Sequence, residues 1–129
     1  MNINFPKPKP EQENNLNPLK VLESFCEDFN KAYGGHFFGN VITSSNVINE
    51  NTVVINYSFW IDFSNVKDYS YRFFEAIPES GDGGFPLKIN AFNAPVEDFK
   101  VASTPKVLLE KIDEIFNSER GRFIILSNY

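Results

Sequence analysis

A cysteine nucleophile with a histidine base would have to be the pair Cys26 and His36, because the sequence holds a single Cys and a single His. A catalytic thiolate needs a base within hydrogen-bond reach. The expected end of a helix, at Gly34-Gly35, separates the two side chains. We expect Cys26 to be a small buried hydrophobe whose thiol pKa is raised by burial, and His36 to be a surface residue. The sequence therefore argues against a cysteine hydrolase.

Acid–base and metal chemistry are equally poorly supported. Acidic residues adjoin one another at Glu27-Asp28, Glu97-Asp98 and Asp113-Glu114, but neighbours on a helix point to different sides and do not converge. The glycine-rich stretch 81–84 leads into an expected strand and not into a helix, so it lacks the helix N-terminus that binds phosphate. Clustered metal ligands are also lacking in the sequence. We predict no catalytic residue, no metal site and no cofactor.

One group of side chains has the composition of a recognition surface. Within a predicted hairpin of strands 52–63 and 68–77, Trp60 lies opposite Arg72, Phe74 lies diagonal to Trp60, and Val54 lies further along. A guanidinium over an indole is favourable by about 0.5–1 kcal/mol, and Trp and Arg are enriched at interface hot spots. These residues form the predicted partner-binding site. In the alternative interpretation, the tail, the 93–102 segment or a helix covers this face.

A second hypothesis places function on the opposite face of the same strands. Tyr57, Tyr69 and Tyr71 share the apolar parity and could carry hydroxyl groups into an aromatic cavity between sheet and helices. Cavities of this kind bind small molecules. A small-ligand-binding protein or an enzyme is therefore the alternative to a protein-binding module.

The strands that position both groups are recognised by alternation. Odd-numbered residues from Val53 to Phe63 are apolar and most even-numbered ones are polar, which is typical of a strand with one buried face. Strands are also expected at about 37–47 and 85–92. We predict that Val47 pairs with Asn51 and Gly39 with Phe59, and that Phe59 pairs with Phe73 and Ile61 with Tyr71.

Two amphipathic helices complete the predicted layers. Asn17-Pro18 and Thr104-Pro105 are cap-plus-proline signals, and apolar residues recur at helical spacing over 18–33 and 104–117. The nearly continuous apolar run 122–127 predicts a further strand that is covered on both faces. The segment from Asn93 to Ala102 is expected to be irregular.

The ends and the bulk properties set the context. Residues 1–16, with Pro alternating with Lys, predict a flexible tail, and 17–129 a single domain. The net charge of −5 argues against nucleic acid as a partner. Because the chain has no apolar run long enough for a membrane span and no signal-peptide core, we expect a cytoplasmic protein without membrane contacts.

The sequence thus predicts an α+β two-layer sandwich, with an antiparallel meander packed against two helices. This order resembles that of secretion chaperones and toxin-immunity proteins, in architecture alone. Secretion chaperones usually end on a helix, whereas this chain is expected to end on a strand. The preferred hypothesis is a non-catalytic protein-binding module, similar to a chaperone, inhibitor or immunity protein. Its partner would be another protein or a second copy of itself.

Overall fold

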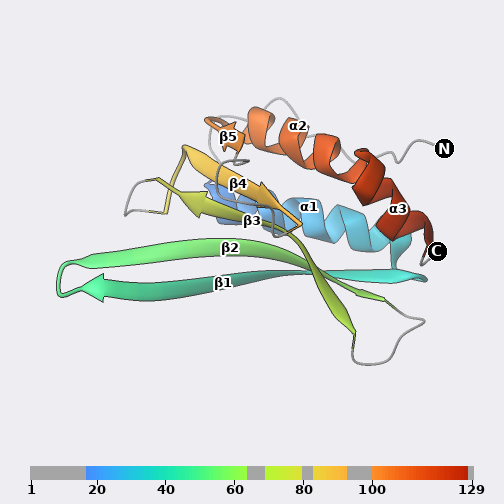
Figure 1. Cartoon of the computed structure of the whole chain (residues 1–129), viewed down its shortest axis with the longest axis horizontal. Coiled ribbons are helices and arrows are strands. Elements are labelled where there is room, and N and C mark those ends of the chain that lie inside the picture. Colours follow the sequence, from blue (N-terminus) through green and yellow to red (C-terminus); the bar gives the residue numbers. More distant parts are fainter. Residues whose placement is uncertain (1–16, 64–68, 80–82, 93–99, 128–129) are drawn as a thin grey trace.

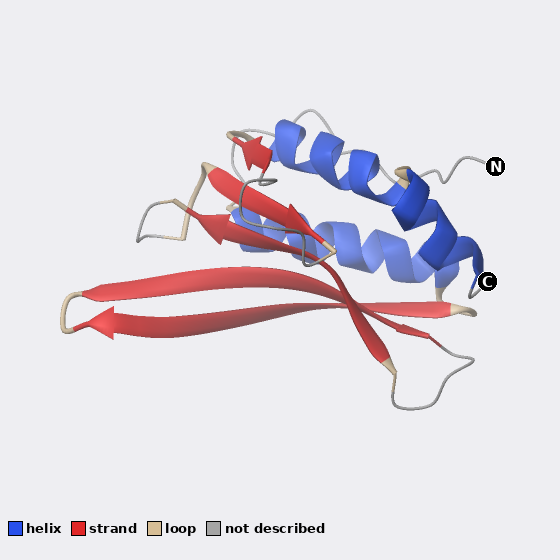
Figure 2. Cartoon of the chain, in the orientation of Figure 1, coloured by secondary structure: helices blue, strands red, loops and turns tan. Residues whose placement is uncertain are grey.

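A computed structural model describes residues 17–63, 69–79, 83–92 and 100–127. The elements are α1 (Pro18–Tyr33), β1 (Phe37–Asn49), β2 (Thr52–Phe63), β3 (Ser70–Pro78), β4 (Leu87–Ala91), β5 (Lys100–Ala102), α2 (Pro105–Phe116) and α3 (Glu119–Ser127). The strands form one antiparallel sheet in the order β1-β2-β3-β4-β5, and the helices gather on one side of it (Figures 1 and 2). The predicted α+β two-layer sandwich is confirmed. The predicted tail 1–16 lies outside the described residues.

Both amphipathic helices begin where the capping signals predict. The Asn17 side chain accepts a hydrogen bond from the Lys20 backbone N–H at 2.9 Å, and the Thr104 hydroxyl accepts one from the Val107 N–H at 3.2 Å. Each cap supplies a partner for an N–H that the helix itself leaves unpaired. The apolar stripes of α1 and α2 then pack against the sheet.

The core is built around the ring of Phe59 on β2. Its centroid lies 5.4–6.0 Å from the ring centroids of Phe25, Phe29, Phe74 and Phe116, so it joins both helices to the sheet. Across the β1–β2 pair the ring occupies space above Gly39, where an added Cβ would lie 2.7 Å from the Phe59 Cζ atom. Gly39 is thus required for close packing of this ring against β1.

The β1–β2 pairing keeps the predicted faces but differs in register. Gly39 lies opposite Ile61, and Val41 opposite Phe59, which shifts the predicted pairing by two residues. The cause is the turn, where Asn49 pairs with Thr52 and leaves only Glu50-Asn51 as the connection. A shift by an even number preserves which side chains are buried, so the core prediction survives the wrong register.

The β2–β3 pairing contains a β-bulge that the sequence analysis missed. Ile61 pairs with Tyr71 as predicted, but Phe59 pairs with Phe74. Phe73 is the extra residue of β3, which has no opposite residue on β2. The extra residue turns two consecutive side chains to the helical side, and both Phe73 and Phe74 are buried there. The predicted Phe59–Phe73 pair is therefore wrong.

The predicted C-terminal strand 122–127 is also wrong, because these residues belong to the helix α3. A short apolar run fits a buried strand and a helix equally well. The Ser118 hydroxyl accepts a hydrogen bond from the Gly121 N–H at 3.0 Å and so caps the helix start. Gly121 packs so tightly on the end of α2 that an added Cβ would meet the Ile115 carbonyl oxygen.

The remaining differences concern the ends of strands. The third and fourth strands span Ser70–Pro78 and Leu87–Ala91 where 68–77 and 85–92 were predicted. The segment expected to be irregular ends in the short strand β5, which pairs with β4. Three residues are too few to produce a recognisable alternation.

We predict that Phe59→Ala lowers the free energy of unfolding by about 3–5 kcal/mol, because a large buried ring leaves a cavity. Urea unfolding measures this loss. Ser44→Ala, at an exposed position of β1, serves as the control and should change it by less than about 0.5 kcal/mol. Equal effects of the two substitutions would contradict the placement of Phe59 at the centre of the core.

Candidate functional site

The face of the sheet that points away from the helices, here named the outer face, carries Trp60 of β2 and Arg72 of β3, two of the predicted partner-binding residues. Phe59 and Ile61 point into the core, so Trp60 between them points outward. Trp60 pairs with Asn40 on β1 and with Arg72 on β3. The structure therefore brings Trp60 and Arg72 together in neighbouring strands, as the sequence predicts.

Hydrogen bonds hold the side chains around Trp60 in place. The half-buried indole N–H of Trp60 donates to the Ser58 hydroxyl at 3.0 Å. The Asn40 amide donates to the Asp62 carboxylate at 3.2 Å, and the Ser70 hydroxyl donates to the same carboxylate. Since these partners stand on three paired strands, they hold the surface in one arrangement.

Arg72 forms an ion pair with Glu75, and their closest atoms lie 3.5 Å apart. The side chains are 33% and 18% exposed, respectively. An ion pair on a partly exposed surface contributes little to stability. Its effect here is to orient the guanidinium on the outer face.

Two residues of the predicted site lie elsewhere. Phe74 is only 1% exposed and stacks on Phe59, because the bulge turns it to the helical side. Its predicted place on the outer face is wrong. Val54 stands on the outer face, but it lies six positions along the extended strand from Trp60, a distance of roughly 20 Å. Neither residue can contact the same small group as Trp60.

The outer face also carries two apolar side chains that sequence reasoning missed. Phe38 and Ile42 on β1 are 52% and 48% exposed. They flank Asn40, which pairs with Trp60. Both have even numbers, as Trp60 does. Alternation along β1, combined with the pairing of β1 with β2, would therefore have placed both side chains on the outer face.

The three tyrosines of the alternative hypothesis do not share a cavity. The Tyr57 hydroxyl is buried and donates to the Gly83 carbonyl at 2.9 Å. Tyr69 is exposed and stacks on Phe63. The Tyr71 hydroxyl accepts a hydrogen bond from Arg120 at 3.5 Å, at the far end of β3 from the partner of Tyr57. The hydroxyl groups therefore face different surroundings.

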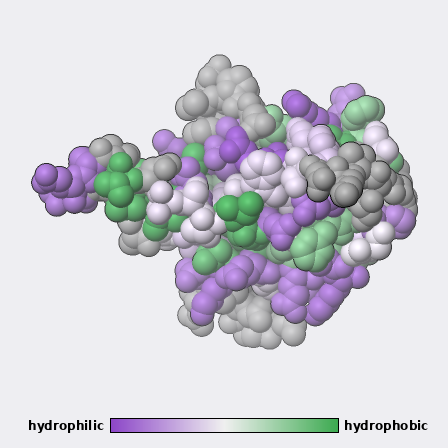
Figure 3. Space-filling model, turned by 90° about the horizontal axis from the view of Figure 1, so that it is seen from below, coloured by the Kyte–Doolittle hydropathy of each residue, from purple (hydrophilic) through white to green (hydrophobic). Residues whose placement is uncertain are grey.

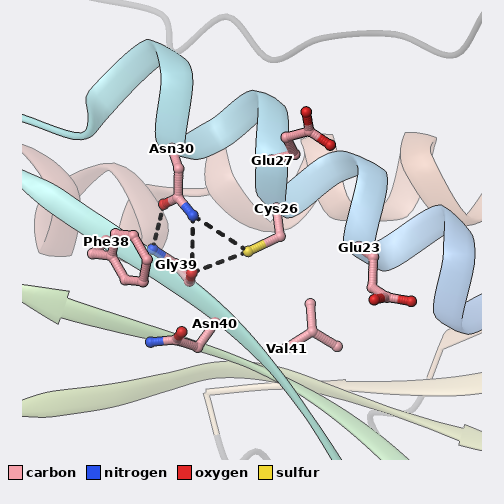
Figure 4. Close-up of a pocket in the computed structure, with 8 residues that line it drawn as sticks. All are labelled: Glu23, Cys26, Glu27, Asn30, Phe38, Gly39, Asn40 and Val41. Carbon is pink, nitrogen blue, oxygen red and sulfur yellow. Dashed lines mark hydrogen bonds between the residues drawn. The ribbon is translucent and has the colours of Figure 1, made fainter.

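A hollow of about 380 Å³ lies between α1 and β1 (Figure 4). Its lining includes Cys26, whose thiol donates to the Gly39 carbonyl at 3.0 Å. Burial, reinforced by the charge of Glu23, raises the pKa of Cys26 above its ordinary value of 9.0, although hydrogen bonds from Asn30 and the Val41 backbone oppose this. A thiol with a raised pKa is a poor nucleophile.

Asn30 is the structural centre of this hollow. Its side-chain oxygen accepts the Gly39 backbone N–H at 2.6 Å, and its amide group donates to the Gly39 carbonyl at 3.1 Å (Figure 4). One amide thus replaces the strand that would otherwise pair with β1 at this residue. His36, predicted at the surface, lies at the end of α1, where its backbone N–H donates to the Tyr33 carbonyl.

Within the described residues, no group of three or more His, Cys, Asp or Glu side chains could hold a metal ion. None of the helices in this described part is long and apolar enough to cross a bilayer.

Comparisons with protein-family models, curated proteins and solved structures find no match to this chain.

We predict that Asn30→Ala lowers the free energy of unfolding by about 1–3 kcal/mol, because the partly buried N–H and carbonyl of Gly39 lose their partner. Chemical denaturation measures the loss. Lys31→Ala removes an exposed ion pair with Glu27 from the next position of the same helix, and is expected to cost less than about 0.5 kcal/mol. A similarly small loss for Asn30→Ala would show that this contact does not fasten β1 to α1.

We further predict that Cys26 reacts more slowly with a thiol reagent in the folded chain than in urea at the same pH. The raised pKa reduces the thiolate fraction, and the thiolate is the reactive form. The midpoint of the rate–pH profile should lie at higher pH in the folded protein. A midpoint below that of the unfolded chain would contradict the dominance of burial.

Proposed function

We propose that this protein is a non-catalytic protein-binding module that engages its partner through the outer face of the sheet, around Trp60 and Arg72. The observation that carries the proposal is that Trp60 stands on the face opposite the helices, in register with Arg72 on the next strand. The indole and the guanidinium are the groups most enriched at interface hot spots.

The surroundings of Trp60 support this proposal. Phe38 and Ile42 add exposed apolar area on the adjacent strand, while Ser58, Asp62 and Glu75 supply polar groups around it. An apolar centre with a polar surround is the usual anatomy of a protein interface. A small-molecule site would instead be concave and enclosed.

Rigidity is the second support. Strand backbones and the hydrogen bonds described above fix the side chains before a partner arrives, so little conformational entropy is lost on binding. This arrangement suits an inhibitor, a chaperone or an immunity protein, whose role is to occupy a surface of another protein. The overall architecture fits these classes and does not choose among them.

The test compares affinity capture from the native host extract by the wild-type chain and by Trp60→Ala. We expect a partner that the wild type retains and Trp60→Ala loses, with a binding loss of about 2 kcal/mol or more. Phe123→Ala is the matched control, because Phe123 is an exposed aromatic residue on the helical layer. A partner lost with both variants, or with neither, would contradict the proposed surface.

Trp60 fluorescence gives an independent prediction, because Trp60 is the sole Trp. We expect acrylamide to quench its emission in the free protein, and a bound partner to shift the emission to shorter wavelength and protect it. A blue emission that acrylamide does not quench, in a protein shown to be monomeric, would mean that the chain itself covers Trp60.

A further inference from the structure

Among the strands that the structure describes, β1 forms one border of the sheet and pairs with β2 alone. It is 13 residues long, and its sequence FFGNVITSSNVIN contains neither a charged residue nor a proline. Proteins normally protect a sheet edge with charges, prolines or a covering segment, since exposed strand edges pair with other chains. A long edge strand without charges or prolines is therefore unusual.

Gly39 shows which backbone groups of β1 point away from β2. Both its N–H and its carbonyl point away from β2, toward Asn30, and the Val41 backbone likewise hydrogen-bonds to Cys26. In an antiparallel pair every second residue directs both backbone groups outward. The register is regular up to Val47, so Thr43, Ser45 and Val47 also present their N–H and carbonyl groups at the free edge.

The helix α1 protects only the first part of this edge. Asn30 and Cys26 occupy the backbone groups at Gly39 and Val41. The far end of the β1–β2 hairpin extends beyond the described helices (Figure 1), and Thr43–Val47 belongs to the half of β1 that leads to this end. Every side chain of this segment that the structure describes is exposed. Among the described residues, the backbone donors and acceptors of this uncharged segment therefore lie at an exposed edge.

The projecting hairpin also carries apolar side chains on both faces. Val47 is 73% exposed and pairs with the exposed Val53 on the helical side, and Ile42 is exposed on the outer side. Figure 3 shows hydrophobic and neutral side chains along the projecting part and hydrophilic ones at its tip. A strand added at this edge would find apolar neighbours above and below the new backbone hydrogen bonds.

We propose that the edge segment Thr43–Val47 of β1 pairs in antiparallel fashion with the same segment of a second copy of this chain. The two copies then share one continuous sheet. A two-fold axis perpendicular to this sheet passes between the two paired segments. Each outward-facing residue exchanges its N–H and carbonyl hydrogen bonds with the other copy.

A second copy fits this edge for two reasons. First, antiparallel pairing of identical strands closes as a symmetric dimer and leaves neither segment unpaired. Second, β1 carries no charge between Phe37 and Asn49, so pairing two copies of this strand brings no like charges of β1 together.

This dimer goes beyond the proposed function, because it uses different residues and does not require that a partner bind Trp60. It also has a consequence for the outer face. In a continuous sheet with a perpendicular two-fold axis, the outer faces of both copies lie on the same side. The dimer would present two Trp60–Arg72 surfaces to one side.

The first experiment measures mass by light scattering and sedimentation over a micromolar-to-millimolar concentration series. We expect the wild type to pass from monomer to dimer. Ser45→Pro removes an outward-facing N–H that the β1–β2 pairing does not use, and should weaken the dimer at least tenfold. Ser45→Ala keeps the N–H and should dimerise like the wild type. A wild-type chain that remains monomeric throughout would overturn the proposal.

A second pair of variants tests the same edge if Ser45→Pro folds poorly. Val47 and Val53 are exposed cross-strand neighbours on the same face, but only Val47 belongs to the edge strand. We expect Val47→Lys to weaken the dimer at least tenfold and Val53→Lys to leave it within threefold of the wild type. An equal loss of dimer in both variants would show association through the apolar face and would overturn edge pairing. A dimer that neither substitution weakens would also overturn edge pairing.

Trp60→Ala separates this inference from the proposed function. It should leave the monomer–dimer equilibrium unchanged while it removes partner capture. Loss of the dimer in Trp60→Ala would overturn edge pairing in favour of association through the outer face.

Discussion

The bulge in β3 opposite Phe59 is the constraint on which the rest of the structure depends. A regular strand would turn Phe73, Glu75 and Ile77 toward the helices, because side chains alternate. This arrangement would bury the carboxylate of Glu75, which is costly unless it is paired. With one extra residue in β3, Phe73, Phe74 and Ala76 are buried instead, and Glu75 reaches the outer face. The bulge thus keeps the Glu75 carboxylate out of the core while the aromatic residues beside it are buried.

The same bulge ties the layers together. The Phe73 ring stacks on Phe116 of α2 at 4.3 Å, while its carbonyl accepts the Phe92 N–H at 3.0 Å just beyond β4. Phe74 stacks on Phe59, which contacts both α1 and α2. With Phe73 and Phe74 on the helical side, β3 keeps Arg72 and Glu75, which form an ion pair, on the outer face. The proposed recognition surface is therefore a consequence of how the core is filled.

Alternation and capping signals were sufficient to predict the layers, the two amphipathic helices and the central strands. They identified Trp60 and Arg72 as neighbours because the hairpin end of β2–β3 is regular. They misplaced Phe74 because alternation assumes that no residue is inserted. The odd-numbered Glu75 was the available sign, since it fell among side chains expected to be buried. The run 122–127 was wrongly predicted to be a strand for another reason. A short apolar segment shows no periodicity that distinguishes a strand from a helix. The edge of β1 could not be found without the strand order.

Nuclear Overhauser contacts of the Phe74 ring test the bulge most directly. In the structure this ring stacks on Phe59 at 5.5 Å, on the side of the sheet opposite Trp60. With selectively labelled aromatic residues, we expect contacts between the ring protons of Phe74 and Phe59, and between those of Phe73 and Phe116. Contacts of the Phe74 ring with the Trp60 indole, in the absence of contacts with Phe59, would show a regular β3 and would contradict this account.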